Sequence, residues 1–428
     1  MFRRLTIASA ALAAALLPVA AYATVSLDDT YGEGGHAGVA VECAPGTMKF
    51  VSATPISGGR VLMLQECAHH NFRLIAMGST GKVDTTYGTS GHLALSFPAS
   101  CSGNGTDLKP IANGGAYLLS SGDAFHDDGN GLDLCIVHVT STGKLVSTFG
   151  GDNSIRHLAT DGGYNTYTGS AVDSLGRLVI FRNVEGGGWQ ASAEYVNRLT
   201  TSGKPDVGFS HDGQRSYTQP FEGGLMWGGV VGTKPVLAIQ VNSPSGTHAV
   251  GTQFVRFDSL GDLDGTFAHD GSRYLSQASL GNATIPWGDT AVDPHGRIVF
   301  TAIHHRYDGG RSTADLFRLD RVGNLDTTFD QATPAIVAGT GQEVVSAHLE
   351  LSAGHDVIEW MYDTAQGGEL LRMTGFNEAD GTRWTALNPQ AVPDDNLGRF
   401  APDVAEFYKY SPADGSETAV FVSRFVVG

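Results

Sequence analysis

Short runs of β-branched and aromatic residues recur along the chain, and each follows a glycine-containing turn. Such runs are GGRVLML at 58–64, GGAYLL at 114–119, LGRLVIF at 175–181, HGRIVF at 295–300 and GHDVIEW at 354–360. A turn that leads into a short apolar run is typical of a hairpin strand. A second kind of strand alternates apolar and polar residues and ends in a turn glycine, as in YVNRLTTSG, FVRFDSLG and LFRLDRVG. Outside the first residues no segment has a helical period, so we predict an all-β protein.

These strand signals are in phase with a recurring phrase, LDTTF at 325–329. The position of its Asp is filled in turn by Asp28, Asp84, Val146, Asp206, Asp264 and Asp326, which are 56, 62, 60, 58 and 62 residues apart. A unit of about 60 residues with four short strands is the size of one blade of a β-propeller. One blade cannot bury both of its faces, so the units are expected to stack around an axis.

The two ends of the chain predict how the ring is closed. The last residues, FVSRFVVG at 421–428, match the third-strand phrase, and LDDTYGEGGHAGVAVE near the start matches the fourth. We therefore predict seven blades of four strands, with six or eight as alternatives, in one domain over residues 24–428. The N-terminal strand then completes the C-terminal blade.

The repeat phrases also carry a family resemblance. LFRLDRVGNLDTTF and its equivalents resemble the delta-60 repeat of bacterial exported proteins, and AVDPHGRIVFTA at 291–302 is similar to the strand–turn–strand unit of NHL-type propellers. The resemblance covers nearly all of the chain after residue 23 and is weakest around LVSTFGGDNS and in the last blade. It implies a propeller fold and no defined activity.

An Arg stands eight residues before the repeat Asp in successive units, a spacing at which a guanidinium and a turn carboxylate can meet. We interpret these residues as structural ion pairs: Arg198–Asp206, Arg256–Asp264, Arg318–Asp326 and Arg372–Asp380. Arg424 has no downstream Asp, so its predicted partner is Asp28, and this pair would latch the two chain ends. The alternative is a ring of arginines that grips an anionic ligand. The Leu and the aromatic residue of each phrase are expected to be buried between blades.

The chain begins with Arg3 and Arg4, an Ala/Leu-rich run and the small-residue site Ala21-Tyr22-Ala23, a pattern that predicts a signal peptide over residues 1–23. The protein is then exported to the periplasm, the cell surface or the medium. No later stretch is apolar enough for a membrane-spanning helix. The net charge of −17, or −19 without the two leader arginines, argues against nucleic acid and anionic lipid as partners.

Four cysteines in an exported chain predict two disulfides. The pairing with the shortest range is Cys43–Cys67 and Cys101–Cys135, and the other two connectivities stay open. HDDGNGLD at 126–133 resembles a calcium loop in composition, with Asp127, Asp128, Asn130 and Asp133 as candidate ligands. It lacks the EF-hand order of ligands, so a solvated acidic loop is the alternative and no cofactor is expected.

No motif for a catalytic serine, a zinc protease or a phosphate-binding loop is present. The sequence therefore favours a monomeric binding or scaffold protein whose loops contact a protein or a carbohydrate. A propeller hydrolase or lyase that acts on an extracellular polymer is one alternative, and a structural component of the cell envelope is another. Polar side chains that converge near the ring axis would favour the enzyme.

Overall fold

The structure is a computed structural model of the 428-residue chain. It describes residues 25–27, 30, 32, 36–40, 49–68, 71–98, 101, 105–121, 134–150, 155–158, 164–186, 190–218, 223–243, 249–283, 290–304, 313–329, 336–337, 343–352, 355–363, 369–377, 379, 381, 383–387, 406–410, 419–423 and 425–427. The statements below concern these residues.

Six four-stranded antiparallel sheets follow one another along the described chain, and in each sheet the strands pair in chain order. The first three sheets are β3 (Lys49–Ile56), β4 (Arg60–Ala68), β5 (Asn71–Met77) and β6 (His92–Ser96); β7 (Gly105–Pro110), β8 (Ala116–Ser121), β9 (Leu134–Val139) and β10 (Ile155–Leu158); and β11 (Tyr164–Val172), β12 (Leu178–Gly186), β13 (Gln190–Leu199) and β14 (Gln214–Thr218). The next three are β15 (Gly223–Val231), β16 (Lys234–Asn242), β17 (Ala249–Arg256) and β18 (Ser272–Ser276); β19 (Thr290–Val292), β20 (Ile298–His304), β21 (Thr313–Leu319) and β22 (Ile336–Val337); and β23 (Glu343–Ser352), β24 (His355–Asp363), β25 (Glu369–Asn377) and β26 (Arg383–Leu387).

Strands from the two ends of the chain pair with each other. β2 (His36–Ala40) lies antiparallel to β28 (Ala419–Ser423), which also pairs with β27 (Glu406–Tyr410). β1 (Val25–Leu27) pairs with β29 (Phe425–Val427). β2 is therefore the outer strand of a three-stranded sheet with β28 and β27, and β1 and β29 form a separate two-stranded sheet.

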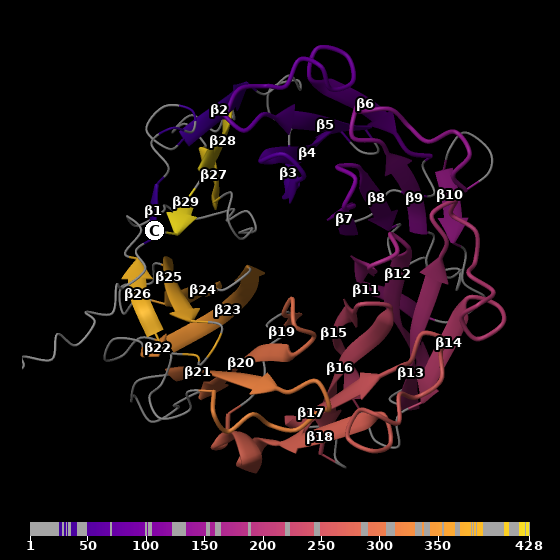
Figure 1. The fold of residues 1–428 in the computed structure, drawn as a ribbon, viewed down its shortest axis with the longest axis vertical. Helices are drawn as coiled ribbons and strands as arrows, with labels where there is room; N and C mark the ends of the chain where they lie inside the picture. Colours follow the sequence, from indigo (N-terminus) through magenta and orange to yellow (C-terminus); the bar gives the residue numbers. More distant parts are fainter. Residues whose placement is uncertain are drawn as a thin grey trace, which may run out of the picture.

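The sheets are arranged radially around a common axis, and the chain runs around the ring from one sheet to the next (Figure 1). The first strands β3, β7, β11, β15, β19 and β23 contact one another in this order. They lie nearest the axis in Figure 1, while β6, β10, β14 and β18 lie at the rim. Side chains on the first strands are therefore the ones placed to face the axis.

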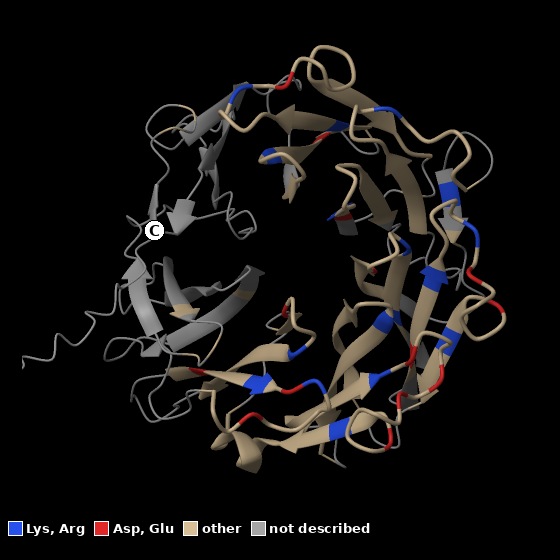
Figure 2. Ribbon diagram, viewed as in Figure 1, with Lys and Arg blue, Asp and Glu red and all other residues tan. Residues whose placement is uncertain are grey.

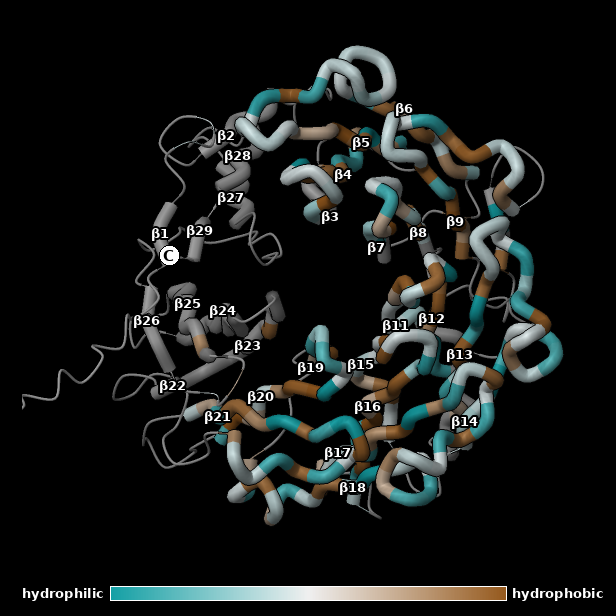
Figure 3. Tube along the Cα trace, in the orientation of Figure 1, coloured by the Kyte–Doolittle hydropathy of each residue, from teal (hydrophilic) through white to brown (hydrophobic). Residues whose placement is uncertain are grey.

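The core consists of apolar layers between neighbouring sheets rather than one central cluster. One layer joins Leu62 and Leu74 of the first sheet to Leu108 and Val137 of the second, and equivalent layers follow around the ring. Strands such as β9 and β12 are accordingly apolar along much of their length (Figure 3). The second, third and fourth sheets are thus buried on both faces, so the stability of one unit depends on its neighbours.

Turn glycines let adjacent units approach closely. Gly261, with φ +95°, lies against the ring of Phe209 in the preceding unit, and Gly323, with φ +84°, lies against Phe267. A Cβ at Gly323 would come within 2.9 Å of that ring. Both the positive φ and the close contact require glycine at this turn.

Cys101 and Cys135 form a disulfide across 34 residues. Closing a loop of this length contributes about 2–4 kcal/mol. Cys67 is also disulfide-bonded, and its predicted partner Cys43 lies outside the described residues. A short 3-10 helix, η3 (Gln277–Leu280), follows β18. Nowhere in the described part of the chain is a helix long and apolar enough to cross a membrane.

Candidate functional site

Arg–Asp ion pairs form where the third strand of a sheet meets the repeat turn. The spacing of eight residues predicted these contacts, and the three pairs inside the described residues are Arg198–Asp206 at 2.8 Å, Arg256–Asp264 at 2.8 Å and Arg318–Asp326 at 2.7 Å. The Arg side chains are only 1–5% exposed. They are therefore inaccessible to a ligand from solvent.

Each of these arginines also joins its own unit to the next. The guanidinium of Arg256 lies 4.6 Å from the centre of the Phe267 ring, and its Nη1 donates to the carbonyl of Arg321 at 2.6 Å. The same two contacts recur elsewhere, as Arg198 with Phe209 and Ser259, and Arg318 with Phe329 and Ala379. The recurring phrase thus builds a brace between units, and the interpretation as a ligand-gripping ring does not fit these contacts.

The repeat Asp holds its own turn and takes a second cation that the sequence analysis missed. Asp264 Oδ1 accepts hydrogen bonds from the backbone and the hydroxyl of Thr266, and its Oδ2 accepts from Lys234 Nζ at 2.8 Å. Lys234 opens the second strand of the sheet. A basic residue at this position also reaches the repeat Asp in the pairs Arg177–Asp206 and Arg60–Asp84. The signal was present in the sequence, as the Arg of GGRVLML and LGRLVIF.

These donors set the ionisation of the repeat Asp. Burial opposes the charged form of Asp264, but the hydrogen bonds from Lys234 and Thr266 and the charge of Arg256 outweigh it. The pKa of Asp264 is therefore well below its ordinary value of 3.8. The pKa values of Asp206 and Asp326 are lowered by the same balance. All three carboxylates are charged at neutral pH.

The second unit replaces the ion pair with aromatic packing. Val146 stands at the Asp position, and His138 at the Arg position. The His138 ring lies 5.6 Å from the Phe149 ring and 4.9 Å from the Tyr117 ring. Burial lowers the pKa of His138 and so favours the neutral imidazole. The second unit therefore lacks both the carboxylate of the repeat Asp and the permanent positive charge of the Arg.

The predicted burial of the repeat phrase is half right. The aromatic residues Tyr87, Phe149, Phe209, Phe267 and Phe329 are all 0% exposed. The prediction for the leucines was wrong for Leu145 and Leu263, which are 37% and 42% exposed. Leu325 is partly buried and packs against the core. Leu263 and Leu325 make equivalent backbone bridges, to Phe257 and Leu319, so the bridge alone does not decide whether the side chain is buried.

Other predicted residues cannot be placed. Asp380, Arg424 and Asp28 lie outside the described residues, and of Arg372 only the backbone, in β25, is described. The candidate calcium ligands Asp127, Asp128, Asn130 and Asp133 also lie outside them. Within the described ranges, no group of three or more His, Cys, Asp or Glu side chains is placed to hold a metal ion.

The turns that join first to second strands and third to fourth strands lie on the same face of the ring, because alternate connections of an antiparallel meander share an edge. We call this the turn face. In the fifth sheet it carries the turn 293–297 and the turn 320–324. Arg321 Nε donates to the carbonyl of His295 at 2.5 Å and so ties these two turns together.

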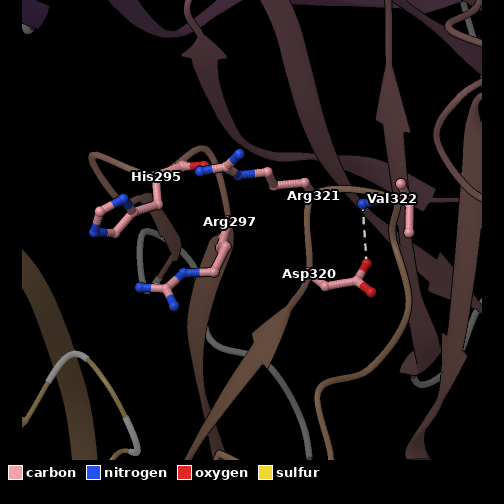
Figure 4. Close-up of a pocket in the computed structure, with 5 residues that line it drawn as sticks. All are labelled: His295, Arg297, Asp320, Arg321 and Val322. Carbon is pink, nitrogen blue, oxygen red and sulfur yellow. Dashed lines mark hydrogen bonds between the residues drawn. The ribbon is translucent and has the colours of Figure 1, made fainter.

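A hollow of about 500 Å³ lies beside this tie and is lined by His295, Arg297, Asp320, Arg321 and Val322. In Figure 4 the His295 ring and the guanidinium of Arg297 extend to the same side, and Asp320 is turned back toward the backbone of Val322. A second hollow of about 430 Å³ lies on the other side of the turn, between 230–232 and 292–296. His295 lines both hollows. We call the two hollows together the turn groove.

The turn groove is built on a rigid frame. Asp293 is 3% exposed, and its Oδ1 accepts the backbone N–H groups of His295 and Arg297 at 2.9 and 2.8 Å. Its Oδ2 accepts from Arg297 Nε. Asp320 Oδ1 likewise accepts from the N–H groups of Val322 and Asn324. The two turns are therefore ordered before any ligand arrives.

A separate polar cluster joins two of the first strands, which line the axis. Asp107 Oδ2 in β7 accepts from Tyr167 Oη at 2.7 Å and from Ser170 Oγ at 3.0 Å, both in β11. Lys109 Nζ lies 3.1 Å from the same oxygen. Asp107 is 7% exposed. Figure 2 shows basic and acidic positions together at β7, on the inner side of the ring.

The radial four-stranded antiparallel sheets define an all-β protein of the β-propeller class. The chain is similar to an ulvan lyase, a polysaccharide lyase, with 9% identity and a TM-score of 0.51 over 90% of this chain and 96% of that one. It is also similar to the β-propeller domain of the trilobed protease from Pyrococcus furiosus, with 8% identity and a TM-score of 0.46 over 89% and 97%. At these identities the likeness concerns the fold alone. No protein-family model and no curated protein match the chain.

Proposed function

We propose that this protein is an exported β-propeller binding protein that holds its ligand in the turn groove. The observation that carries the proposal is the pair of hollows, about 500 and 430 Å³, on either side of the turn 293–297. Each volume falls in the range of small-molecule and cofactor sites. Two adjoining hollows make an elongated site, which suits a segment of a polymer better than a compact metabolite.

The ring supplies the rigid platform. We propose a closed ring of seven blades in which β2 is the outer strand of the C-terminal blade, an arrangement in keeping with the delta-60 repeat that the phrases resemble. The pairing of β2 with β28 supports closure. Gly32 N–H also donates to Thr80 O at 3.0 Å, and the neighbouring units at Gly88 and Thr142 make the same bond at 2.9 Å. A closed ring keeps the groove turns fixed relative to each other.

The test is a thermal-shift screen of the mature protein against extracellular polysaccharides, their oligomers and soluble proteins, followed by a variant that fills the groove. Val322 is 48% exposed, so Val322→Trp is expected to fold and to occupy the first hollow. Val207, 71% exposed in another repeat turn, gives the matched control Val207→Trp. A ligand at 100 times its dissociation constant stabilises the wild type by about 2.7 kcal/mol. We expect this stabilisation to be lost in Val322→Trp and kept in Val207→Trp.

Two results of this screen would contradict the proposal. The first is a ligand that stabilises Val322→Trp as much as the wild type, because its site then lies outside the groove. The second is a screen in which no polymer or protein stabilises the wild type.

A second candidate function is supported by the Asp107 cluster. A carboxylate beside a tyrosine hydroxyl and a lysine ammonium is a set of groups that can move protons, and its place on the first strands is where propeller enzymes carry polar side chains. This arrangement favours a hydrolase or lyase that acts on an extracellular polymer. In the binding proposal the same cluster only ties β7 to β11.

Asp107→Asn separates the two roles. For an enzyme, release of oligomers from a polymer substrate should fall about 100-fold or more, with binding in the turn groove unchanged. The release is followed by size-exclusion chromatography of the polymer. If the wild type cleaves no polymer that it binds, the binding function stands alone.

A further inference from the structure

The turn groove offers a guanidinium group on an acidic protein. The whole chain carries a net charge of −17, and the groove is lined by Arg297 and Arg321 together with Asp293 and Asp320. An acidic protein repels polyanions in general, so only a local basic group attracts them. What the groove offers an anion therefore depends on which of these four charges already have partners.

Arg321 is held with its terminal nitrogens available. Its backbone carbonyl accepts from the buried Arg256, and its Nε donates to His295 O. Among the described residues these contacts use neither of its Nη atoms. A guanidinium that is fixed at Nε loses little entropy when its outer edge binds a carboxylate or a sulfate.

The carboxylates of Asp293 and Asp320 bind groups of their own turns. Both Oδ atoms of Asp293 accept bonds from its own turn, and the side chain of Arg297, which is 19% exposed, is oriented by one of them. Asp320 accepts from Val322 N–H and from Asn324 N–H and Nδ2. These carboxylates stabilise the turns, and the guanidinium of Arg321 is left as the charged group that meets a ligand.

The lining argues against a peptide as the occupant. Extended peptides usually add to an open strand edge, whereas the described lining of the groove consists mainly of turns. Protein partners are anchored by aromatic residues, and no aromatic anchor other than the His295 ring is among the lining residues. Small apolar side chains such as Val230 and Pro294, together with the guanidinium of Arg321, suit a sugar chain that carries an acidic group.

We infer that the turn groove binds an acidic polysaccharide, with Arg321 contacting its carboxylate or sulfate groups. This inference rests on the proposed binding function. Arg321 makes the direct contact at its Nη atoms, and His295 separates the two hollows that successive sugar units occupy.

The experiment measures binding of dextran sulfate, polygalacturonate and neutral dextran to the mature protein by isothermal titration calorimetry at low salt. We expect at least one polyanion to bind about tenfold or more tightly than dextran, and its affinity to fall as salt is added. Arg321→Ala should lower the affinity for that polyanion by about 10- to 100-fold, and Arg321→Lys should recover part of the lost affinity. The control is Arg215→Ala, which removes an arginine that is 39% exposed and lies outside the groove.

The possible outcomes separate this inference from the binding function. Dextran that binds as tightly as both polyanions would overturn the acidic preference and leave a binding protein. If no polyanion binds, or if Arg215→Ala weakens binding as much as Arg321→Ala, the inference is wrong, while a ligand found in the thermal-shift screen and lost in Val322→Trp still supports the proposed function. If a soluble acidic protein binds the groove more tightly than the polysaccharides do, the inferred ligand is a protein and the carbohydrate inference is wrong.

Discussion

Replacing Arg256 by methionine is expected to lower the free energy of unfolding by about 3–5 kcal/mol. Methionine keeps much of the aliphatic volume but removes the charge that faces Asp264, whose side chain is 4% exposed. The variant also loses the bond to the carbonyl of Arg321 in the next unit and the contact with the Phe267 ring. Lys234 remains as a partner of Asp264, which keeps the loss inside this range. Urea denaturation followed by tryptophan fluorescence measures the difference.

The control is again Arg215→Ala, because Arg215 lies 3.8 Å from Asp262 in an exposed pair. Its loss should cost about 0–1 kcal/mol.

The pH dependence of unfolding provides a second check. The folded pKa of Asp264 lies below the unfolded value of 3.8, so its contribution is complete above pH 3.8 and is lost as the pH falls toward the folded pKa. The difference in unfolding free energy between wild type and Arg256→Met should therefore decrease below pH 3.8. A difference that does not change with pH would show that it does not come from the Arg256–Asp264 charge pair.

Arg424→Ala is expected to destabilise the protein by a similar amount, about 3–5 kcal/mol, through loss of the proposed latch with Asp28. The register supports the pairing of these two positions. Leu27 faces Phe425 across β1 and β29, just as Leu325 faces Leu319 next to the pair Arg318–Asp326. Asp28→Ala should show the same loss, and the double variant should lose less than the sum of the two. Urea denaturation of the wild type, the two single variants and the double variant gives the coupling energy between Arg424 and Asp28.

An Arg424→Ala variant as stable as the wild type would rule out the latch. Additive losses in the double variant would mean that both residues matter but do not contact each other. In either case the pairing of β2 with β28 remains as the link between the chain ends.

Local sequence spacing predicted the strands, the units and three ion pairs, because an Arg and an Asp eight residues apart sit on either side of one turn. It did not predict the second cation, since Arg177 and Asp206 are 29 residues apart and meet only after the sheet has formed. It misplaced Leu145 and Leu263 because an apolar residue beside a buried aromatic was taken to share its environment. Leu325 has the same backbone bridge as Leu263 and yet packs against the core, so burial at this position depends on the neighbouring side chains of the folded protein.

The turn groove was beyond sequence reasoning for a similar reason. The phrases AVDPHGR and LDRVG were recognised as repeat elements, and nothing in them marks His295 or Arg321 as different from their equivalents in other units. Their proximity depends on the bond between turns that are 26 residues apart. The second hollow needs a neighbouring sheet as well.

The arginine that reaches into the following unit makes the third, fourth and fifth repeats modules with two complementary ends. One end supplies a guanidinium, and the other supplies the carbonyl that the previous guanidinium binds, as at Ser259, Arg321 and Ala379. When such a module is duplicated in tandem, the new junction is chemically complete without any compensating substitution. Gene duplication can therefore lengthen this chain one repeat at a time, and the angle between neighbouring sheets, rather than the chemistry of the joint, then limits how many modules one circle accepts.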